Sequence, residues 1–222
     1  MKERKELQNA EKNKVKISGE LCDGFSISHE VFGEKFYKNR VKIVRHSGTE
    51  DYIPILVSNY LFSDNNIEGQ FAGKWVEIEG ELRSYNKKDK NKTHLYLNVF
   101  AKEMEIYDTQ EEIEDVTKLN ENFIFLDGYI CKKAKTRITP SSNVFITDLL
   151  IAVNRKYGKS DYIPSIVWGR EAIWAGKLDV GTRVQLEGRF QSREYTKYVN
   201  NEEYTKVAYE LSVKSIQEFE ED

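Results

Sequence analysis

Few residues in this chain have the types and spacing that catalysis or metal binding requires. The 222 residues include three histidines and two cysteines, Cys22 and Cys131, too few for a Cys/His zinc site or a disulfide framework. No glycine-rich phosphate loop and no Gly-x-Ser-x-Gly nucleophile turn occurs in a suitable context. What remains is the chemistry of arginine and lysine, which attract anions, and of aromatic side chains, which make up 12% of the residues. We therefore expect no enzyme and no bound cofactor or metal.

Arginine and tyrosine recur together in a motif that the chain contains twice. Arg-x5-Asp-Tyr-Ile-Pro occurs at Arg45–Pro54 and again, 110 residues later, at Arg155–Pro164. Landmarks on either side keep nearly the same offset: they are Gly19 with Gly128 and Glu79-Gly80 with Glu187-Gly188. A near-constant offset over several landmarks indicates an internal repeat, so the sequence predicts two similar domains.

The repeat divides the chain into four segments. We predict an N-terminal domain at 15–107, an acidic linker at 108–118, a C-terminal domain at 119–217 and a short acidic tail at 218–222. Alternating apolar and polar residues, such as Val41 and Ile43, predict strands throughout both copies.

One stretch in each copy, between the third and fourth strands, is predicted to be helical: 59–72 in the first and 170–177 in the second. Five strands with a helix after the third is the order of an OB fold, so the predicted class is all-β, with two tandem five-stranded OB-fold barrels. Pro54 and Pro164 lie inside the third strands and predict a bulge or a free edge there, because proline cannot donate to a ladder.

Three segments of the second copy form a fairly specific combination: Ala-Val-Asn-Arg at 152–155, Trp-Gly-Arg-Glu-Ala at 168–172 and Glu-Gly-Arg-Phe-Gln-Ser-Arg at 187–193. The second copy thereby resembles the bacterial single-stranded DNA-binding protein (SSB) family over nearly its whole length. The first copy departs further, since Ser58 stands where Trp168 stands. The resemblance implies a protein that coats single-stranded DNA without strong sequence preference in replication, recombination or repair, with no catalytic step.

The resemblance also implies which residues bind the strand. A site that accepts any sequence needs aromatic faces for the bases and cations for the phosphates, because every base has a π-face. The candidate stacking residues are Tyr162 and Trp168 on the third strand, Tyr195 after the fourth and Tyr157 on the hairpin between the second and third. The candidate phosphate-binding residues are Arg155, Lys156, Arg170, Arg189 and Arg193. In the first copy the corresponding set is Arg45, Tyr52, Arg83 and Tyr85, followed by Lys87, Lys88, Lys90 and Lys92.

Two plainer interpretations of these residues stay open at this point. Aromatic residues of a barrel can fill its interior, since strands alternate between an inward and an outward face. The lysine run from Lys87 can be a solvated hairpin tip.

The acidic residues are concentrated outside the two copies. The net charge of the chain is -3, while the linker and the last seven residues each carry -4, so the rest of the chain is left at +5. The tail resembles the partner-recruiting tail of the family but lacks the Ile-Pro-Phe tip, which weakens the expectation that it recruits replication and repair proteins. By analogy with family members that assemble four folds, two folds per chain predict a homodimer.

The sequence also predicts a cytoplasmic, nucleoid-associated location, because Met1–Lys14 does not read as a signal peptide and no apolar run is long enough to span a membrane. A rival hypothesis is an OB-fold accessory protein, such as a primosome, plasmid or phage factor, that binds a partner protein or RNA. An enzyme with an OB appendage is disfavoured, because the two copies and the linker account for nearly all residues of the chain.

Overall fold

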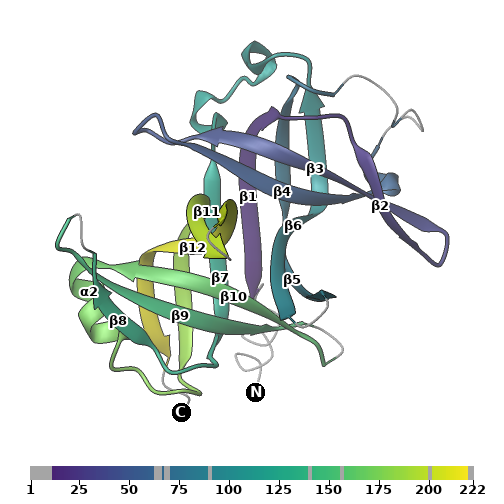
Figure 1. Cartoon of the computed structure of the whole chain (residues 1–222). Coiled ribbons are helices and arrows are strands. Elements are labelled where there is room, and N and C mark those ends of the chain that lie inside the picture. Colours follow the sequence, from purple (N-terminus) through teal and green to yellow (C-terminus); the bar gives the residue numbers. More distant parts are fainter. Residues whose placement is uncertain are drawn as a thin grey trace, which may run out of the picture.

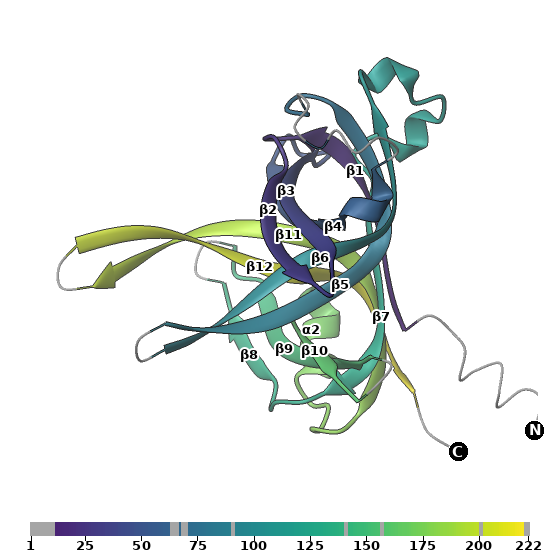
Figure 2. The same ribbon diagram turned by 90° about the vertical axis from the view of Figure 1, so that its right-hand side faces the viewer.

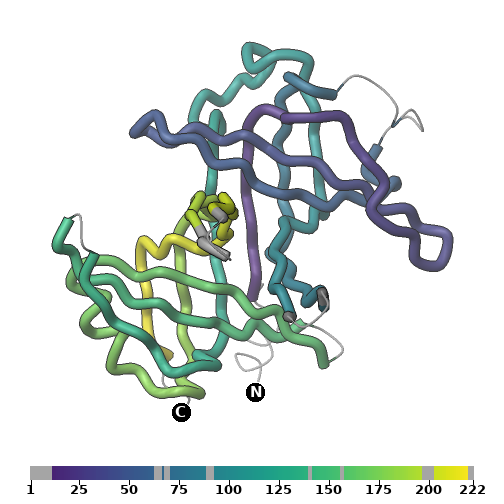
Figure 3. Tube along the Cα trace, viewed as in Figure 1, coloured from purple at the N-terminus to yellow at the C-terminus, as the bar shows by residue number. Residues whose placement is uncertain are grey.

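Two β-barrels, formed by successive halves of the chain, lie next to each other (Figures 1 and 3). The computed structural model describes residues 12–62, 67, 71–89, 92–139, 142–155, 158–199 and 202–219. Strands predominate in both halves, as predicted, because apolar residues alternate with polar ones and bury one face of each strand. In the first strand, Val15, Ile17 and Leu21 are almost fully buried.

The first barrel contains six strands. They are β1 (Asn13–Leu21), β2 (Ser26–Val31), β3 (Glu34–Val44), β4 (Glu50–Ser58), β5 (Trp75–Asp89) and β6 (Lys92–Tyr107), with the 3-10 turn η1 (Asn59–Leu61) after β4. The barrel closes in the order β1, β3, β4, β6, β5 and back to β1, and the β4–β6 pair is parallel. This is the strand order of an OB fold.

The second barrel repeats this order. It contains β7 (Asn122–Ile130), β8 (Lys135–Ile138), β9 (Phe145–Asn154), β10 (Ser160–Trp168), the helix α2 (Gly169–Ala175), β11 (Arg183–Val199) and β12 (Glu202–Phe219). The predicted two tandem OB folds are confirmed. Each barrel has one strand more than predicted, because β2 and β8 fold back on β3 and β9 as short edge strands.

The two predicted helices differ in outcome. The second is confirmed by α2, whereas the described part of 59–72 contains only the turn η1 before the extended residue Phe62. Register confirms that Ser58 takes the place of Trp168, since Ser58 pairs with Phe36 and Trp168 with Ile146 at the same step of the two hairpins.

The repeated Glu-Gly pair has a packing cause. Gly80 and Gly188 each lie at a bulge in the pairing of the long hairpins β5–β6 and β11–β12. A Cβ atom at either position would collide with a backbone carbonyl of the partner strand, that of Phe100 or of Ser212. Glycine is therefore needed for the two strands to approach each other.

The barrels are joined by a direct strand pairing. β1 pairs with β7 in antiparallel register from Asn13–Leu126 to Ile17–Asn122, so all twelve strands form one continuous sheet. The segment between the barrels also packs against them: it contains two 3-10 turns, η2 (Gln110–Glu112) and η3 (Val116–Lys118), and Ile113 is buried between them.

Two long hairpins extend beyond the barrels. Figure 2 shows β5–β6 and β11–β12 projecting on the same side of the molecule. Among the described residues, no helix has the length and apolar character to cross a bilayer.

Candidate nucleic-acid interface

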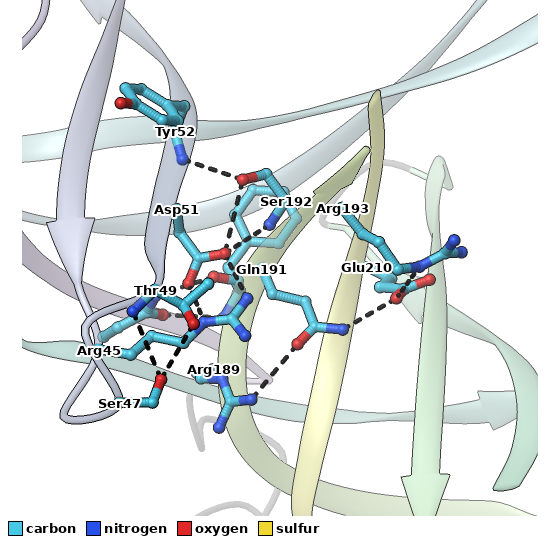
Figure 4. A network of polar contacts seen from close by, with 12 residues as sticks. Arg45, Ser47, Thr49, Asp51, Tyr52, Arg189, Gln191, Ser192, Arg193 and Glu210 are labelled. Carbon is cyan, nitrogen blue, oxygen red and sulfur yellow. Dashed lines mark hydrogen bonds and ion pairs between the residues drawn. The ribbon is translucent and has the colours of Figure 1, made fainter. Parts of the chain in front are cut away.

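The aspartate of the repeated motif is buried at the contact between the two barrels. Asp51 of β4 has no exposed surface, and Arg45 donates two hydrogen bonds of 2.6 Å to its carboxylate. From the other barrel, the Ser192 backbone N–H donates to Asp51 Oδ1 at 2.8 Å, and the Tyr52 N–H donates back to Ser192 Oγ at 3.0 Å (Figure 4). A buried carboxylate requires this full set of donors, so Asp51 fixes β4 against β11.

The second copy of the motif makes the reciprocal contact. Asp161 is equally buried, pairs with Arg155 and accepts the Ser84 backbone N–H at 2.5 Å, while the Tyr162 N–H donates to Ser84 Oγ at 2.8 Å. These two contacts, which we call the aspartate junctions, explain why the motif recurs. The junctions lie along the free strand edges that the prolines predict. β4 pairs with β6 only at Ile55 and Leu56, and β10 pairs with β12 only at Ser165 and Ile166. The backbone N–H groups of Tyr52 and Tyr162 can therefore bond across the junctions.

A groove of about 1120 Å³ runs beside the Asp51 junction. Five arginines line it, against three glutamates, and the exposed faces of Tyr52 and Trp168 line it as well. We call it groove two; its arginines are Arg40, Arg45, Arg137, Arg189 and Arg193. Although most of its wall is the second barrel, Arg40, Arg45 and Tyr52 come from the first.

A second groove, of about 1230 Å³, lies beside the Asp161 junction and is called groove one. Its cations are Lys38, Arg40, Arg83 and Arg155, and Asp23 is its one acidic lining residue. Tyr85 and Tyr96 stack on each other across the β5–β6 pair, with ring centroids 5.2 Å apart and planes 13° from parallel. Both rings are about half exposed, so a base can stack against them.

Arg189 differs from the arginines of the junctions. Burial lowers the pKa of its guanidinium, and the nearby charge of Arg45 lowers it further, while Asp51 opposes these effects. Its guanidinium donates a 3.4 Å hydrogen bond to the amide oxygen of Gln191 (Figure 4), and within the described ranges no carboxylate lies within ion-pair distance of it. An anion entering groove two would relieve this repulsion.

Comparison with known proteins agrees with this geometry. Residues 121–219 match the single-strand binding protein family. A single-stranded DNA-binding protein of Clostridium tetani is 31% identical over 80 residues, which are 33% of this chain and 55% of that protein. The chain thus spans about half the length of that relative.

Solved structures of a single-stranded DNA-binding protein from Thermus aquaticus, the wild type and a deletion variant, match both barrels. Each has a TM-score of 0.70 and 16% identity; the matches cover 95% of this chain and 94% and 95% of those chains. At this identity the similarity shows the fold alone, and it supports the tandem arrangement in which the first barrel accompanies the second, family-matching one.

The structure regroups the residues that the SSB resemblance singled out. Arg155, expected with the second copy, lines groove one beside Arg83 and Tyr85. Arg45 and Tyr52, expected with the first copy, line groove two beside Trp168, Arg189 and Arg193. Each groove is therefore built from both barrels.

Other candidate residues lie outside the two grooves. Tyr162 is exposed and its backbone is bonded to Ser84, a lining residue of groove one. Arg170 is exposed on α2, and Lys87 and Lys88 are exposed along the arm of β5. Tyr195 is exposed within β11, where Arg193 lies 5.8 Å from its ring; the expectation that it follows the fourth strand is wrong, because β11 continues to Val199. Lys90, Lys156 and Tyr157 lie outside the described residues, as does the side chain of Lys92.

Among the cationic and tyrosine residues that line the grooves, the sequence analysis missed five: Lys38, Arg40, Tyr96, Arg137 and Tyr209. Tyr96 could have been found from hairpin register, since it pairs directly with Tyr85. The others depend on how the barrels pack together, for which the sequence contains no signal.

Proposed function

We propose that this protein binds single-stranded DNA without strong sequence preference and protects it during replication, recombination or repair. Bases stack on exposed aromatic side chains, and arginines neutralise the phosphates. No catalytic step is involved. The observation that carries the proposal is groove two, where five arginines surround the exposed rings of Trp168 and Tyr52.

The two grooves and the hollow beside the linker differ in the sign of their charge, and this difference supports the proposed binding of DNA in the grooves. Grooves one and two are rich in cations, whereas a hollow beside the linker is lined by acidic residues including Glu77, Glu105, Glu112, Glu114 and Asp115. A polyanion is attracted to the first surface and repelled by the second.

The long hairpins extend the proposed binding surface. Tyr195 and Arg193 on β11, with Tyr85, Lys87 and Lys88 on β5, place further rings and cations on arms that project on one side of the molecule (Figure 2). In this proposal Tyr162 and Arg170 bind the strand where it leaves the grooves, and Arg45 and Arg155 act chiefly by holding the junctions. Lys156 and Tyr157, which lie outside the described residues, are proposed to bind the strand from the sequence alone.

The proposal includes a cytoplasmic homodimer with four OB folds, whose acidic tails contact replication or repair proteins without the Ile-Pro-Phe tip. A sedimentation measurement with and without oligonucleotide tests the dimer.

The function is tested by fluorescence titration with oligo-dT, oligo-dA and a duplex of equal length. A variant with Trp75→Phe and Trp174→Phe leaves Trp168 as the reporter, and its emission should be quenched by either single strand. Binding to about four phosphates predicts a slope of log affinity against log salt of about -3. The control is Lys133→Gln, which removes an exposed lysine outside both grooves and should leave the affinity and the salt slope unchanged.

Equal affinity for duplex, or a salt slope near zero, contradicts the proposal. If oligonucleotides fail to bind while a protein or structured RNA is captured, the accessory-protein hypothesis is favoured instead.

A further inference from the structure

Grooves one and two share two lining residues, Arg40 and Tyr209. Arg40 comes from β3 of the first barrel and Tyr209 from β12 of the second. The two grooves therefore meet at a point where the barrels face each other, and neither barrel alone provides this meeting point. We call Arg40 and Tyr209 the crossing residues.

Arg40 is placed to reach either groove. Its guanidinium is 2.9 Å from Asp23, which lines groove one, and 6.0 Å from the ring centroid of Tyr52, which lines groove two. The side chains of Arg40 and Asp23 are 50% and 57% exposed. An ion pair this exposed is weak, so a phosphate can replace the aspartate at little cost.

Tyr209 supplies an aromatic ring at the same point. It is half-buried against Phe190, with ring centroids 6.0 Å apart. Burial raises the pKa of its phenol, and the nearby positive charge of Arg40 partly offsets this. A cation and a ring side by side are the pair of groups that one nucleotide needs.

The crossing breaks the symmetry of the repeat. Arg40 pairs with Pro54 in the first barrel, and in the second barrel Leu150 pairs with Pro164 at the same step. Likewise Tyr209 pairs with Ser192, whereas Leu97 pairs with Ser84. The equivalent positions therefore hold two leucines, which offer neither a cation nor an aromatic ring.

We propose that one strand of DNA passes from groove one to groove two within a single chain, and that it crosses at Arg40 and Tyr209. This inference rests on the proposed function and adds the path of the strand. Because only one of the two pseudo-equivalent positions has the crossing residues, the strand crosses at one defined place.

The test compares oligo-dT of about 8 nucleotides, which fits one OB fold, with oligo-dT of about 30 nucleotides, which reaches both. In the wild type, occupying both grooves with one strand should raise affinity by about 100-fold or more. Arg40→Gln and Tyr209→Leu should each reduce this long-to-short ratio by about tenfold. Lys35→Gln is the matched control, since Lys35 is an exposed cation on the same strand that lines neither groove; it should leave the ratio unchanged.

An unchanged ratio in both crossing variants, with short strands still bound by the wild type, overturns the crossing while the proposed function stands. Failure of the wild type to bind either length overturns both. Arg40 is exposed, so Arg40→Gln is expected to keep the wild-type urea midpoint, which separates loss of the crossing from loss of the fold.

Discussion

Arginine residues in this protein serve two different structural purposes. Arg45 and Arg155 neutralise buried aspartates, and the hydrogen bonds to those aspartates raise the pKa of each guanidinium. Arg189 has no carboxylate partner among the described residues, and partial loss of solvent lowers the pKa of its guanidinium. The first kind stabilises the fold, and in the proposed function the second binds a phosphate.

This difference predicts opposite effects of two matching substitutions. Arg189→Gln should weaken binding of oligo-dT about tenfold, the effect of losing one charged hydrogen bond of about 1.5 kcal/mol, without lowering the free energy of unfolding. Arg155→Gln should lower the free energy of unfolding, because it leaves the buried Asp161 with only the more distant Arg83, 3.8 Å away, as its cation. Urea unfolding and fluorescence titration measure both quantities, and equal loss of stability in the two variants would contradict the assignment.

Asp127 predicts how stability depends on pH. Burial by itself raises the pKa of this carboxyl, but hydrogen bonds from Arg183 and Gln185 outweigh burial and hold the pKa below its ordinary 3.8. A lowered folded-state pKa means that the stabilisation is present above about pH 4 and is lost as pH falls through the folded pKa. Asp127→Asn should therefore be less stable than the wild type at pH 7, and the difference should shrink below pH 4.

Because this carboxyl group binds one proton, its contribution to the free energy of unfolding can change by at most about 1.4 kcal/mol per pH unit. Urea midpoints at several pH values measure it. A difference between wild type and variant that stays constant down to pH 2 would show that Asp127 does not titrate in this range.

At the scale of strands, the aspartate junctions connect elements that share no backbone ladder. The Asp51 junction links β4 to β11, and the Asp161 junction links β10 to β5. In each, the aspartate accepts the backbone N–H of a serine, and the hydroxyl of that serine accepts the backbone N–H of the tyrosine that follows the aspartate. Because the junctions also border the grooves, their geometry sets the position of Tyr52 and Tyr162.

Asp161→Asn should lower the free energy of unfolding by about 2 kcal/mol, since the buried Arg155 and Ser84 donors lose their charged acceptor. Asp108→Asn is the control, because Asp108 forms an exposed ion pair with Lys74 and its loss should cost at most about 1 kcal/mol. Urea denaturation measures both; equal, small losses would mean that the junction contributes little.

At the scale of the whole molecule, the two barrels form one sheet. The β1–β7 pairing, both junctions and the packed linker all connect them. Structures joined this extensively are expected to unfold together rather than one domain at a time.

Urea unfolding should therefore show one transition by all probes. Single-tryptophan variants report on each half, with Trp75 in the first barrel and Trp168 in the second. Their fluorescence midpoints should coincide with the far-ultraviolet circular dichroism midpoint. Two separated transitions would show that the barrels fold independently.

The sequence by itself determined the repeat, the two OB folds, and the aromatic and cationic residue types of the binding surface, because strand periodicity and glycine placement are local constraints. Tertiary structure decided how those residues combine. The motif arginines face buried aspartates, each groove draws side chains from both barrels, and Arg40 meets Tyr209. The contacts between the barrels, such as Asp161 with Ser84 and Asp51 with Ser192, join residues 77 and 141 positions apart, and their geometry depends on the angle between two rigid barrels, which no local pattern encodes.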